Sequence, residues 1–339
     1  MKSKLKLTLI ILTIMIICLS VGAYAAYTLT AKDVTYTKPD GTTVSVKEAL
    51  DELRGEATSA TVNISMTEAQ SDNMFTKKTN SLVEDEYGNK IKIPAGFKIK
   101  VDSSTNDAKT ADKGIVIIDK NDNEFVWIPT GTIYKNTEKT ASETINLNRY
   151  TFDSNGNPTA QNDAEIDNYY QELETSTYGN VYAKDINNFK TKAAATGSGG
   201  FYIGRYEART GTARSAYYDE LTTLTTKSSD YVYNYVTQIQ ASLLSREMYQ
   251  DAKTFKSDLM NSYAWDTATL FLQECGTNPT YSRKTSANTT SNGGLATTGT
   301  NNLETSDIEC NVYDMASNVR EWTTETSSAT GRTDKTSLY

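Results

Sequence analysis

The chain has 339 residues, 37% of them hydrophobic and 22% charged, which is enough apolar material for one large domain or two smaller ones. The formal net charge is −8 and no basic stripe is present, so nucleic acid is not an expected partner, because phosphate binding needs clustered Lys and Arg. The sequence contains no histidine. Catalytic triads, HExxH peptidase sites and His-ligated zinc are therefore excluded, and any metal must be held by oxygen or thiolate.

A hydrophobic leader of bacterial type opens the chain. A basic segment at residues 2–6 precedes an apolar run at residues 7–21, and Ala23 and Ala25 form a small-x-small cleavage pattern. We expect residues 1–25 to act as a signal peptide, or as an N-terminal membrane anchor if they are not cleaved. Either outcome predicts an exported protein, located outside the cell or on its surface.

A small hairpin–helix unit is predicted at residues 26–55. Two β-prone runs, at residues 33–37 and 42–46, flank a Pro-Asp-Gly turn. A capping box at residues 45–48 then begins a helix. Residues 56–80 are polar and have little periodicity, which predicts a linker.

From residue 81 the pattern changes to hairpins. A buried strand at residues 114–118 and a returning strand at residues 124–129 are joined by a turn. This turn resembles the opening of an EF-hand loop, but Glu124 and Thr130 stand where that loop needs Gly and Glu. We therefore interpret it as a turn and not as a calcium loop.

The middle of the chain is predicted to hold a polar insertion at residues 135–200. It contains one expected helix near residues 166–173 and ends in a glycine run at residues 197–200. The glycine run follows no strand and opens no helix, so a phosphate loop is not expected. The next strand is predicted at residues 201–207, where aromatic and aliphatic side chains alternate.

Two helices are predicted after this strand. One apolar face is formed by Leu244, Met248, Ala252, Phe255 and Leu259. A second helix is expected to begin at Ser262 as its N-cap and to end at Gly276, and residues 280–306 then read as a long exposed loop.

Three segments together resemble the formylglycine-generating-enzyme-like family, also called the sulfatase-modifying-factor family. Residues 124–131 resemble its F-V-x-I-P-x-G strand, residues 200–207 its F-x-I-G-x-Y-E strand, and residues 311–322 its Y-D-M-x-G-N-V-x-E-W motif. The resemblance covers about residues 82–325. It implies that residues 81–339 form an irregular α+β fold related to C-type lectins, with short strands, few helices and long loops.

The parts of this family that carry catalysis have no counterpart in the sequence. The family's closing strands and its paired copper-binding cysteines follow the last motif, whereas this chain ends at Tyr339, so we expect the C-terminal strands to be missing. Cys275 and Cys310 precede the motif and cannot be matched to that pair. One disulfide and two free buried thiols are both open for them. We expect no copper and no catalytic residue.

The last motif still predicts a cation site. In the family this loop holds calcium, and the resemblance implies Asp314, Ser317, Val319 and Glu321 as the ligands in this chain. Oxygen-only ligation with two carboxylates suits Ca²⁺. The alternative is that Asp314 only caps a turn.

Three functions follow from these expectations. Export, a lectin-related fold and a Tyr-rich polar composition predict a cell-surface or secreted binding or display protein, whose partner is an unknown extracellular ligand or envelope component. The alternatives are a copper-dependent oxidase that acts on a peptidyl cysteine and a structural component of the cell envelope. If the leader is retained, the membrane is a partner as well.

Overall fold

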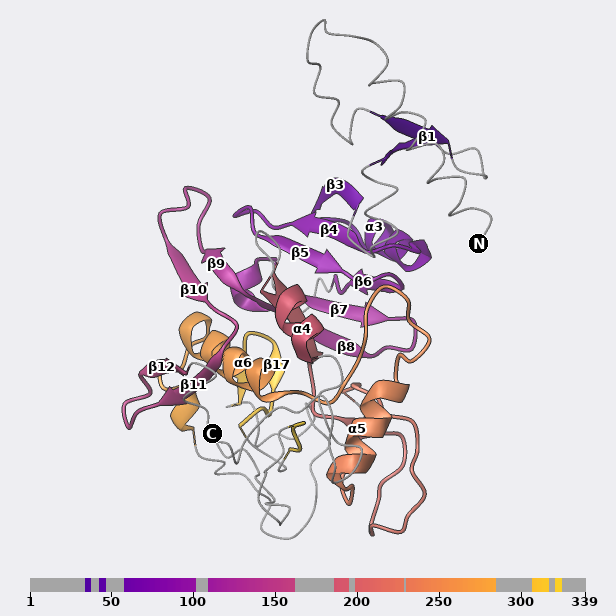
Figure 1. Ribbon diagram of the computed structural model, residues 1–339, viewed down its shortest axis with the longest axis vertical. Coiled ribbons are helices and arrows are strands. Elements are labelled where there is room, and N and C mark those ends of the chain that lie inside the picture. The colour runs from indigo at the N-terminus through magenta and orange to yellow at the C-terminus, as the bar shows by residue number, and fades with distance from the viewer. Residues whose placement is uncertain are drawn as a thin grey trace, which may run out of the picture. The chain divides into compact units, whose positions relative to one another are not determined.

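The structure is a computed structural model, and it divides into two compact units, residues 1–50 and 51–339 (Figure 1). It describes residues 34–37, 43–46, 58–101, 109–161, 186–194, 199–228, 230–284, 307–316 and 321–324. The leader predicted at residues 1–25 lies outside these ranges.

The first unit contains the predicted pair of strands. β1 (Thr35–Thr37) and β2 (Thr43–Ser45) are antiparallel, with Tyr36 opposite Val44. This pairing confirms the strands expected on either side of the Pro-Asp-Gly turn. The helix expected after residue 46 lies outside the described residues.

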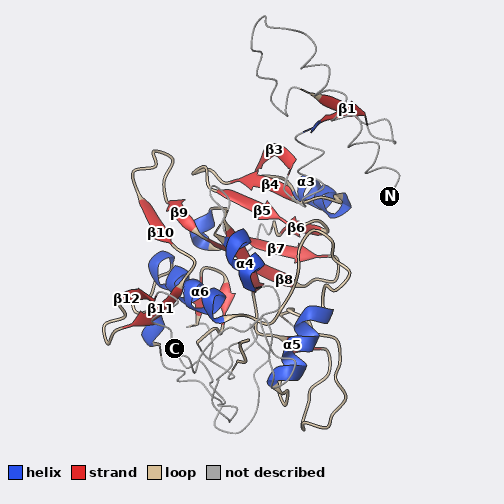
Figure 2. Ribbon diagram, in the orientation of Figure 1, coloured by secondary structure: helices blue, strands red, loops and turns tan. Residues whose placement is uncertain are grey.

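A 4-stranded antiparallel sheet forms the centre of the second unit, in the order β13-β8-β7-β6 (Figures 1 and 2). Its strands are β6 (Phe97–Ile99), β7 (Val116–Asp119), β8 (Glu124–Pro129) and β13 (Gly200–Gly204). The predicted strands β7 and β8 are confirmed, because their β-branched and aromatic residues pack into the core. β13 ends earlier than the strand predicted to reach residue 207.

Gly200 explains the end of the glycine run before β13. Its φ is +149°, and a Cβ at this position would lie 2.3 Å from the ring of Trp127 on the neighbouring strand β8. Only glycine lets the backbone approach the Trp127 ring this closely. Gly200 therefore serves strand packing, and residues 197 and 198 of the run lie outside the described residues.

Residues 58–76 do not form the linker that their composition predicts. β3 (Thr58–Asn63) pairs in parallel with β4 (Ser81–Glu84), which pairs with β5 (Lys90–Ile93). Between β3 and β4 lie α3 (Glu68–Asp72) and the 3₁₀ helix η1 (Asn73–Thr76). The prediction was wrong because Ile64 and Met74 of this segment are buried in the core and Met66 packs against it.

The region predicted as a polar insertion forms two hairpins and a helix in its described part. β9 (Gly131–Tyr134) pairs with β10 (Ser142–Ile145), and β11 (Arg149–Phe152) pairs with β12 (Pro158–Gln161). α4 (Ile186–Ala193) follows and packs on β13. The helix expected near residues 166–173 lies outside the described residues.

The two later helices differ from their predictions at one boundary each. α5 (Gln238–Glu247) stops at Glu247, so the helix expected to continue to Leu259 is too long by more than two turns. α6 (Ser262–Cys275) ends at Gly276 as predicted, but Asn261 is its N-cap. The Asn261 side chain accepts from the N–H of Ala264, which satisfies one free backbone N–H of the first turn. Ser262 is the first residue inside the helix and does not take this position.

Short elements complete the second unit. They are the hairpins β14 (Arg209–Thr210) with β15 (Tyr231–Val232) and β16 (Ile308–Glu309) with β17 (Val312–Tyr313), and the 3₁₀ helices η2 (Ala111–Lys113) and η3 (Tyr281–Arg283). The protein is thus a mixed α+β molecule with few helices and several small, mostly antiparallel sheets. Within the described residues, no helix has the length and apolar character needed to cross a membrane.

Candidate functional site

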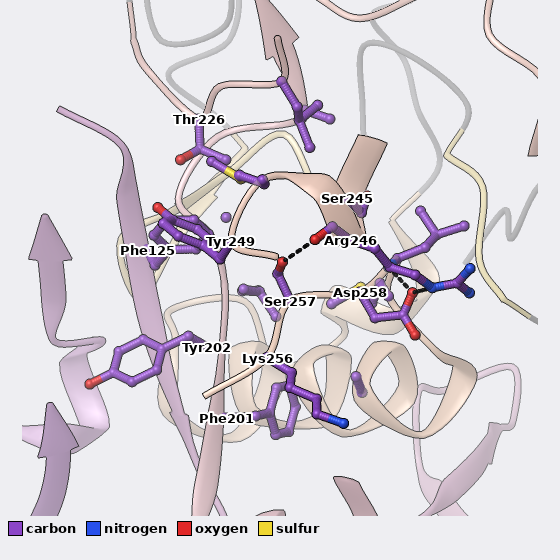
Figure 3. Close-up of a pocket in the computed structure, with 18 of the residues that line it drawn as sticks. Phe125, Phe201, Tyr202, Thr226, Ser245, Arg246, Tyr249, Lys256, Ser257 and Asp258 are labelled. Carbon is purple, nitrogen blue, oxygen red and sulfur yellow. Dashed lines mark hydrogen bonds and ion pairs between the residues drawn. The ribbon is translucent and has the colours of Figure 1, made fainter. Parts of the chain in front are cut away.

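A large cavity lies between the central sheet and the helices of the second unit. Its volume is about 1270 Å³, above the range of about 300–1,000 Å³ typical of ligand pockets. Strands β8 and β13, helices α4 and α5 and the segment at residues 248–261 contribute its walls. Figure 3 shows the part of the cavity beside α5, with Phe125 and Tyr249 on one side and Arg246 and Asp258 on the other.

One wall is a cluster of four aromatic rings. Phe97 lies 5.8 Å from Phe125, 5.5 Å from Tyr249 and 5.5 Å from Phe255, measured between ring centroids. Edge and tilted contacts of this kind are favourable beyond the area they bury. The Tyr249 hydroxyl donates to Asp119 Oδ2 at 2.7 Å, and burial, followed by the Asp119 charge, raises the pKa of Tyr249. This wall is therefore rigid and uncharged.

A second part of the lining belongs to β8, β13 and α4. Trp127 and Tyr202 are cross-strand partners whose ring centroids lie 4.9 Å apart. The Tyr202 hydroxyl donates to the carbonyl of Lys92, another lining residue, at 3.0 Å. Phe189 on α4 contacts Phe201 at 5.4 Å.

One pair of opposite charges lies at the α5 side of the cavity. Arg246 Nε donates to Asp258 Oδ1 at 2.9 Å, and the Ser257 hydroxyl donates to the Arg246 carbonyl at 3.5 Å (Figure 3). The ion pair fixes the segment after α5 against the helix. The cavity thus has aromatic walls and an ion pair at its border.

Two tyrosines mark the rim of the cavity. Tyr217 and Tyr235 form a T-shaped pair with centroids 5.6 Å apart and an interplanar angle of 88°. Both line the cavity, and both remain exposed, at 64% and 42%. They are the points at which aromatic surface continues from the cavity to the outside of the molecule.

The structure brings together two of the four residues predicted to hold calcium. Asp314 is buried, has a left-handed φ of 57° and donates its N–H to the carbonyl of Asp307 at 2.9 Å. Burial raises the pKa of Glu321 well above its usual value, and the charges of Glu207, Asp307 and Asp314 raise it further. Ser317 and Val319 lie outside the described residues.

Two cations accompany this group of acids. Lys284 pairs with Asp307 at 2.8 Å, and Tyr281 donates its hydroxyl to the same carboxylate at 2.9 Å. Burial lowers the pKa of Arg209 to about 10, partly offset by neighbouring charges that include Glu207 and Asp314. Within the described ranges, no three or more Cys, Asp or Glu side chains are arranged to hold a metal ion. A calcium site would therefore need the ligands at residues 317 and 319.

Cys275 and Cys310 are free thiols that lie away from the cavity lining. Hydrogen bonds link the segments that carry the two cysteines. Thr277 donates its N–H and its hydroxyl to the Glu309 carboxylate at 2.7 and 2.8 Å. Burial raises the pKa of Cys275 to about 12 and that of Cys310 well above its usual value. Both thiols are therefore protonated and weakly nucleophilic at neutral pH.

Sequence reasoning missed the cavity, since its walls come from segments that are far apart in the chain. The only available signal was the density of tyrosine between residues 202 and 249, which periodicity alone does not assign to a surface or a core. The predicted calcium residue Glu321 does line the cavity, together with Glu207. The two candidate sites thus meet at these carboxylates.

Comparison with known proteins finds no relative of this chain. The sequence matches no protein-family model, and neither the curated proteins nor the solved structures contain a match.

Proposed function

We propose that the protein is an exported cell-surface or secreted binding protein that holds an extracellular ligand in the aromatic cavity without converting it. Export rests on the basic and apolar leader at residues 1–25. The observation that carries binding is the cavity itself, with its volume of about 1270 Å³ and its rigid aromatic walls. A lectin-related fold, which the resemblance implies, is compatible with this role.

The absence of conversion is supported by the chemistry of the cavity lining. The sequence contains no histidine, and neither Cys275 nor Cys310 is among the residues that line the cavity. The described lining therefore offers neither an imidazole as general base nor a thiolate as metal ligand. The carboxyl groups that do line the cavity have a second proposed role, described below.

A ligand screen with a blocked cavity tests the proposal. Ser245 lines the cavity from α5, so Ser245→Trp should fill part of it, whereas Leu243→Trp on the same helix adds the same ring at an exposed position. We expect a compound from a library of saccharides, peptides and amphiphiles to raise the melting temperature of the wild type and of Leu243→Trp, but not of Ser245→Trp. Mass spectrometry should recover that compound unchanged. A screen without any such compound, or equal effects in both variants, contradicts the proposal.

Two alternatives have weaker support. A copper-dependent oxidase would use Cys275 and Cys310, but both thiols are protonated and lie outside the cavity lining. We expect no stoichiometric Cu(I) uptake in competition with bicinchoninate, and uptake lost in Cys275→Ser would favour the oxidase. A structural envelope component would remain in the insoluble cell-wall fraction after expression in a bacterium, whereas a secreted binding protein would appear in the medium.

We also propose that a calcium ion is held by Asp314 and Glu321, completed by Ser317 and the carbonyl of Val319. The supporting observation is charge: Glu207, Asp307, Asp314 and Glu321 are four neighbouring carboxyl groups, accompanied by the cations Arg209 and Lys284. Hard oxygen donors with excess negative charge suit a divalent cation. A calcium-dependent rise in melting temperature that requires Glu321 tests the proposal.

A further inference from the structure

Exposed apolar side chains are confined to one segment of the described chain. All the large hydrophobic side chains that are exposed among the described residues lie between residues 217 and 243: Tyr217, Tyr218, Leu221, Tyr231, Tyr235 and Leu243. Four of the six are tyrosines, and five belong to residues 211–236, which we call the tyrosine loop (residue 229 is outside the described part). Contiguous exposed apolar side chains on a soluble domain mark a surface that contacts something else.

A buried arginine holds the tyrosine loop in one conformation. Arg214 is 6% exposed and donates to four backbone carbonyls, those of Asp219 (2.8 Å), Glu220 (2.7 Å), Asn234 (3.1 Å) and Tyr235 (2.9 Å). A planar guanidinium that bridges both ends of a loop fixes the geometry of the backbone between them. The tyrosines are thus presented by a preorganised frame, which lowers the entropy lost on binding.

A second set of hydrogen bonds supports the same loop from Tyr233. Its hydroxyl accepts from the N–H of Thr222 at 3.0 Å and donates to the Thr222 carbonyl at 3.1 Å. Tyr233 is itself buried, so this residue serves the frame and not the surface. The loop therefore separates tyrosines that build it from tyrosines that it exposes.

Tyr235 is held in an unfavourable backbone conformation at the rim of the cavity. Its φ is 49°, in the left-handed region that a bulky side chain rarely adopts, and Arg214 binds its carbonyl. This conformation places the Tyr235 ring edge against face with Tyr217, with both side chains on the cavity rim. Strain of this kind persists where the surrounding structure enforces it, and it is concentrated at binding sites.

Two of the loop's three acidic side chains, Asp219 and Asp230, are used inside the loop, whereas Glu220 is exposed. The Asp219 carboxylate accepts from the N–H groups of Ser215 (2.6 Å) and Ala216 (2.9 Å), and Asp230 accepts from the Thr225 hydroxyl at 2.6 Å. The exposed face is therefore dominated by tyrosine rings and hydroxyls, and Glu220 is the acidic side chain that it exposes. The Tyr217–Tyr235 pair itself is uncharged, so it suits a ligand with apolar C–H faces and hydroxyl edges.

We propose that Tyr217 and Tyr235 form a stacking platform for a neutral saccharide chain that enters the cavity beside them. The C–H face of a sugar ring packs on the electron-rich face of an aromatic ring, and the tyrosine hydroxyls exchange hydrogen bonds with sugar hydroxyls. A concave rim favours a narrow chain over a folded protein, which needs a flatter patch of about 800 Å² on each partner. The inference rests on the proposed binding function and names its ligand class.

Affinity electrophoresis of the full chain tests this inference. The gels are cast with one neutral polysaccharide each, hydroxyethyl cellulose, soluble starch or mannan, and with polygalacturonate as an anionic comparison. We expect retardation in at least one neutral gel and none in polygalacturonate. Tyr217→Ala and Tyr235→Ala should each weaken the apparent affinity at least about tenfold, in line with the loss of one buried aromatic anchor.

Tyr218 supplies a matched control. It is 91% exposed and adjacent to Tyr217, but it is not among the residues that line the cavity. Tyr218→Ala should stay within about twofold of the wild type, as expected for a position outside the anchor. Because Tyr217 is largely exposed, Tyr217→Ala is expected to fold, and an unchanged melting temperature checks this.

Three results would overturn the saccharide platform: no retardation in any neutral gel, retardation by polygalacturonate alone, or equal losses in Tyr217→Ala and Tyr218→Ala. The broader binding function fails separately. If no neutral polysaccharide binds, but another compound raises the melting temperature in a manner blocked by Ser245→Trp, the saccharide inference is wrong and the cavity remains a binding site.

Discussion

At the scale of single residues, the strained backbone of Tyr235 lowers the stability of the fold at a proposed binding residue. A left-handed conformation costs a residue with a side chain about 1–2 kcal/mol, and glycine adopts it freely but loses about 0.5–1 kcal/mol of entropy on folding. Tyr235 has a φ of 49°. We therefore expect Tyr235→Gly to leave the free energy of unfolding in urea within about 1 kcal/mol of the wild type.

Tyr231 is the matched comparison for this measurement. It is exposed to a similar extent, at 47% against 42% for Tyr235, but it lies in strand β15. Glycine in a strand has no conformational strain to relieve, so Tyr231→Gly should destabilise by about 1 kcal/mol. A greater loss in Tyr235→Gly than in Tyr231→Gly would show that the Tyr235 ring stabilises the fold more than its backbone strains it.

The two thiols predict a second residue-scale result. Burial raises the pKa of Cys275 to about 12 from an ordinary value of 9.0, so the native state holds its proton where the unfolded state releases it. The free energy of unfolding should therefore fall as the pH rises above 9. Below pH 9 the thiol is protonated in both states, so it adds no pH dependence to the free energy of unfolding. At pH 8, iodoacetamide should label neither Cys275 nor Cys310 until urea unfolds the chain. Rapid labelling of the native protein would contradict the burial of these thiols.

At the scale of elements, one turn is used three times. Residues 85–89, 119–123 and 153–157 each begin with Asp and end with Asn, and their fourth residues have φ values of 81°, 63° and 84°. In each turn the Asp carboxylate accepts from the N–H groups of the third and fifth residues and from the Asn side chain, at 2.7–3.0 Å. The same carboxylate that suggested an EF-hand opening at residue 119 is thus used by its own turn and by the Tyr249 hydroxyl.

Burial distinguishes the first of these turns from the third. Asn89 also exchanges two hydrogen bonds of 2.8 Å with the backbone of Tyr134, whereas Asn157 is exposed and contacts only its own turn in the described structure. We expect Asn89→Ala to destabilise by about 3 kcal/mol, because it leaves buried backbone groups without partners. Asn157→Ala should cost less than about 1 kcal/mol. Equal losses in urea melts would mean that the turn alone, and not its tie to Tyr134, sets the stability.

The sequence predicts elements well where a local signal is sufficient. The hairpin of β7 and β8 follows from a β-branched run, a turn and a second run, and the end of α6 follows from Gly276. The end of α5 cannot be predicted in this way, because apolar residues at helical spacing continue to Leu259. In the structure the helix ends at Glu247, and the chain then turns so that Asp258 pairs with Arg246. A tertiary ion pair of this kind has no signature in local spacing.

At the scale of the whole molecule, the candidate site depends on contacts that no local pattern contains. The cavity joins residues of β8, β13, α4 and α5, and its rim depends on a buried Arg214 whose carbonyl partners lie 5 to 21 residues away. The predicted cation loop is different, since Asp314 and Glu321 are close in the sequence and could be proposed from a motif. The motif does not include the two neighbouring acids, Glu207 and Asp307.

These additional acids make the stability of the molecule sensitive to divalent cations. Four carboxyl groups face two cations, Arg209 and Lys284, so mutual repulsion remains if all of them are ionised. Calcium that binds only the folded state would add about 2.7 kcal/mol at a hundredfold excess over its dissociation constant. Extracellular sites commonly bind at about 0.1–1 mM.

We therefore expect the melting temperature to rise by about 2–4 °C in 10 mM Ca²⁺ relative to chelator, as a stabilisation of up to this size implies for a chain of this length. Mg²⁺ should do less, because it demands tighter octahedral geometry. Glu321→Ala should abolish the rise, whereas Glu220→Ala, at an exposed position of the tyrosine loop, should retain it. Identical melts with calcium and chelator would remove the ion and leave Lys284 and Arg209 as the counter-charges of the cluster. In that case Lys284→Met should destabilise by about 3–5 kcal/mol, because Asp307 would lose its partner in a buried ion pair.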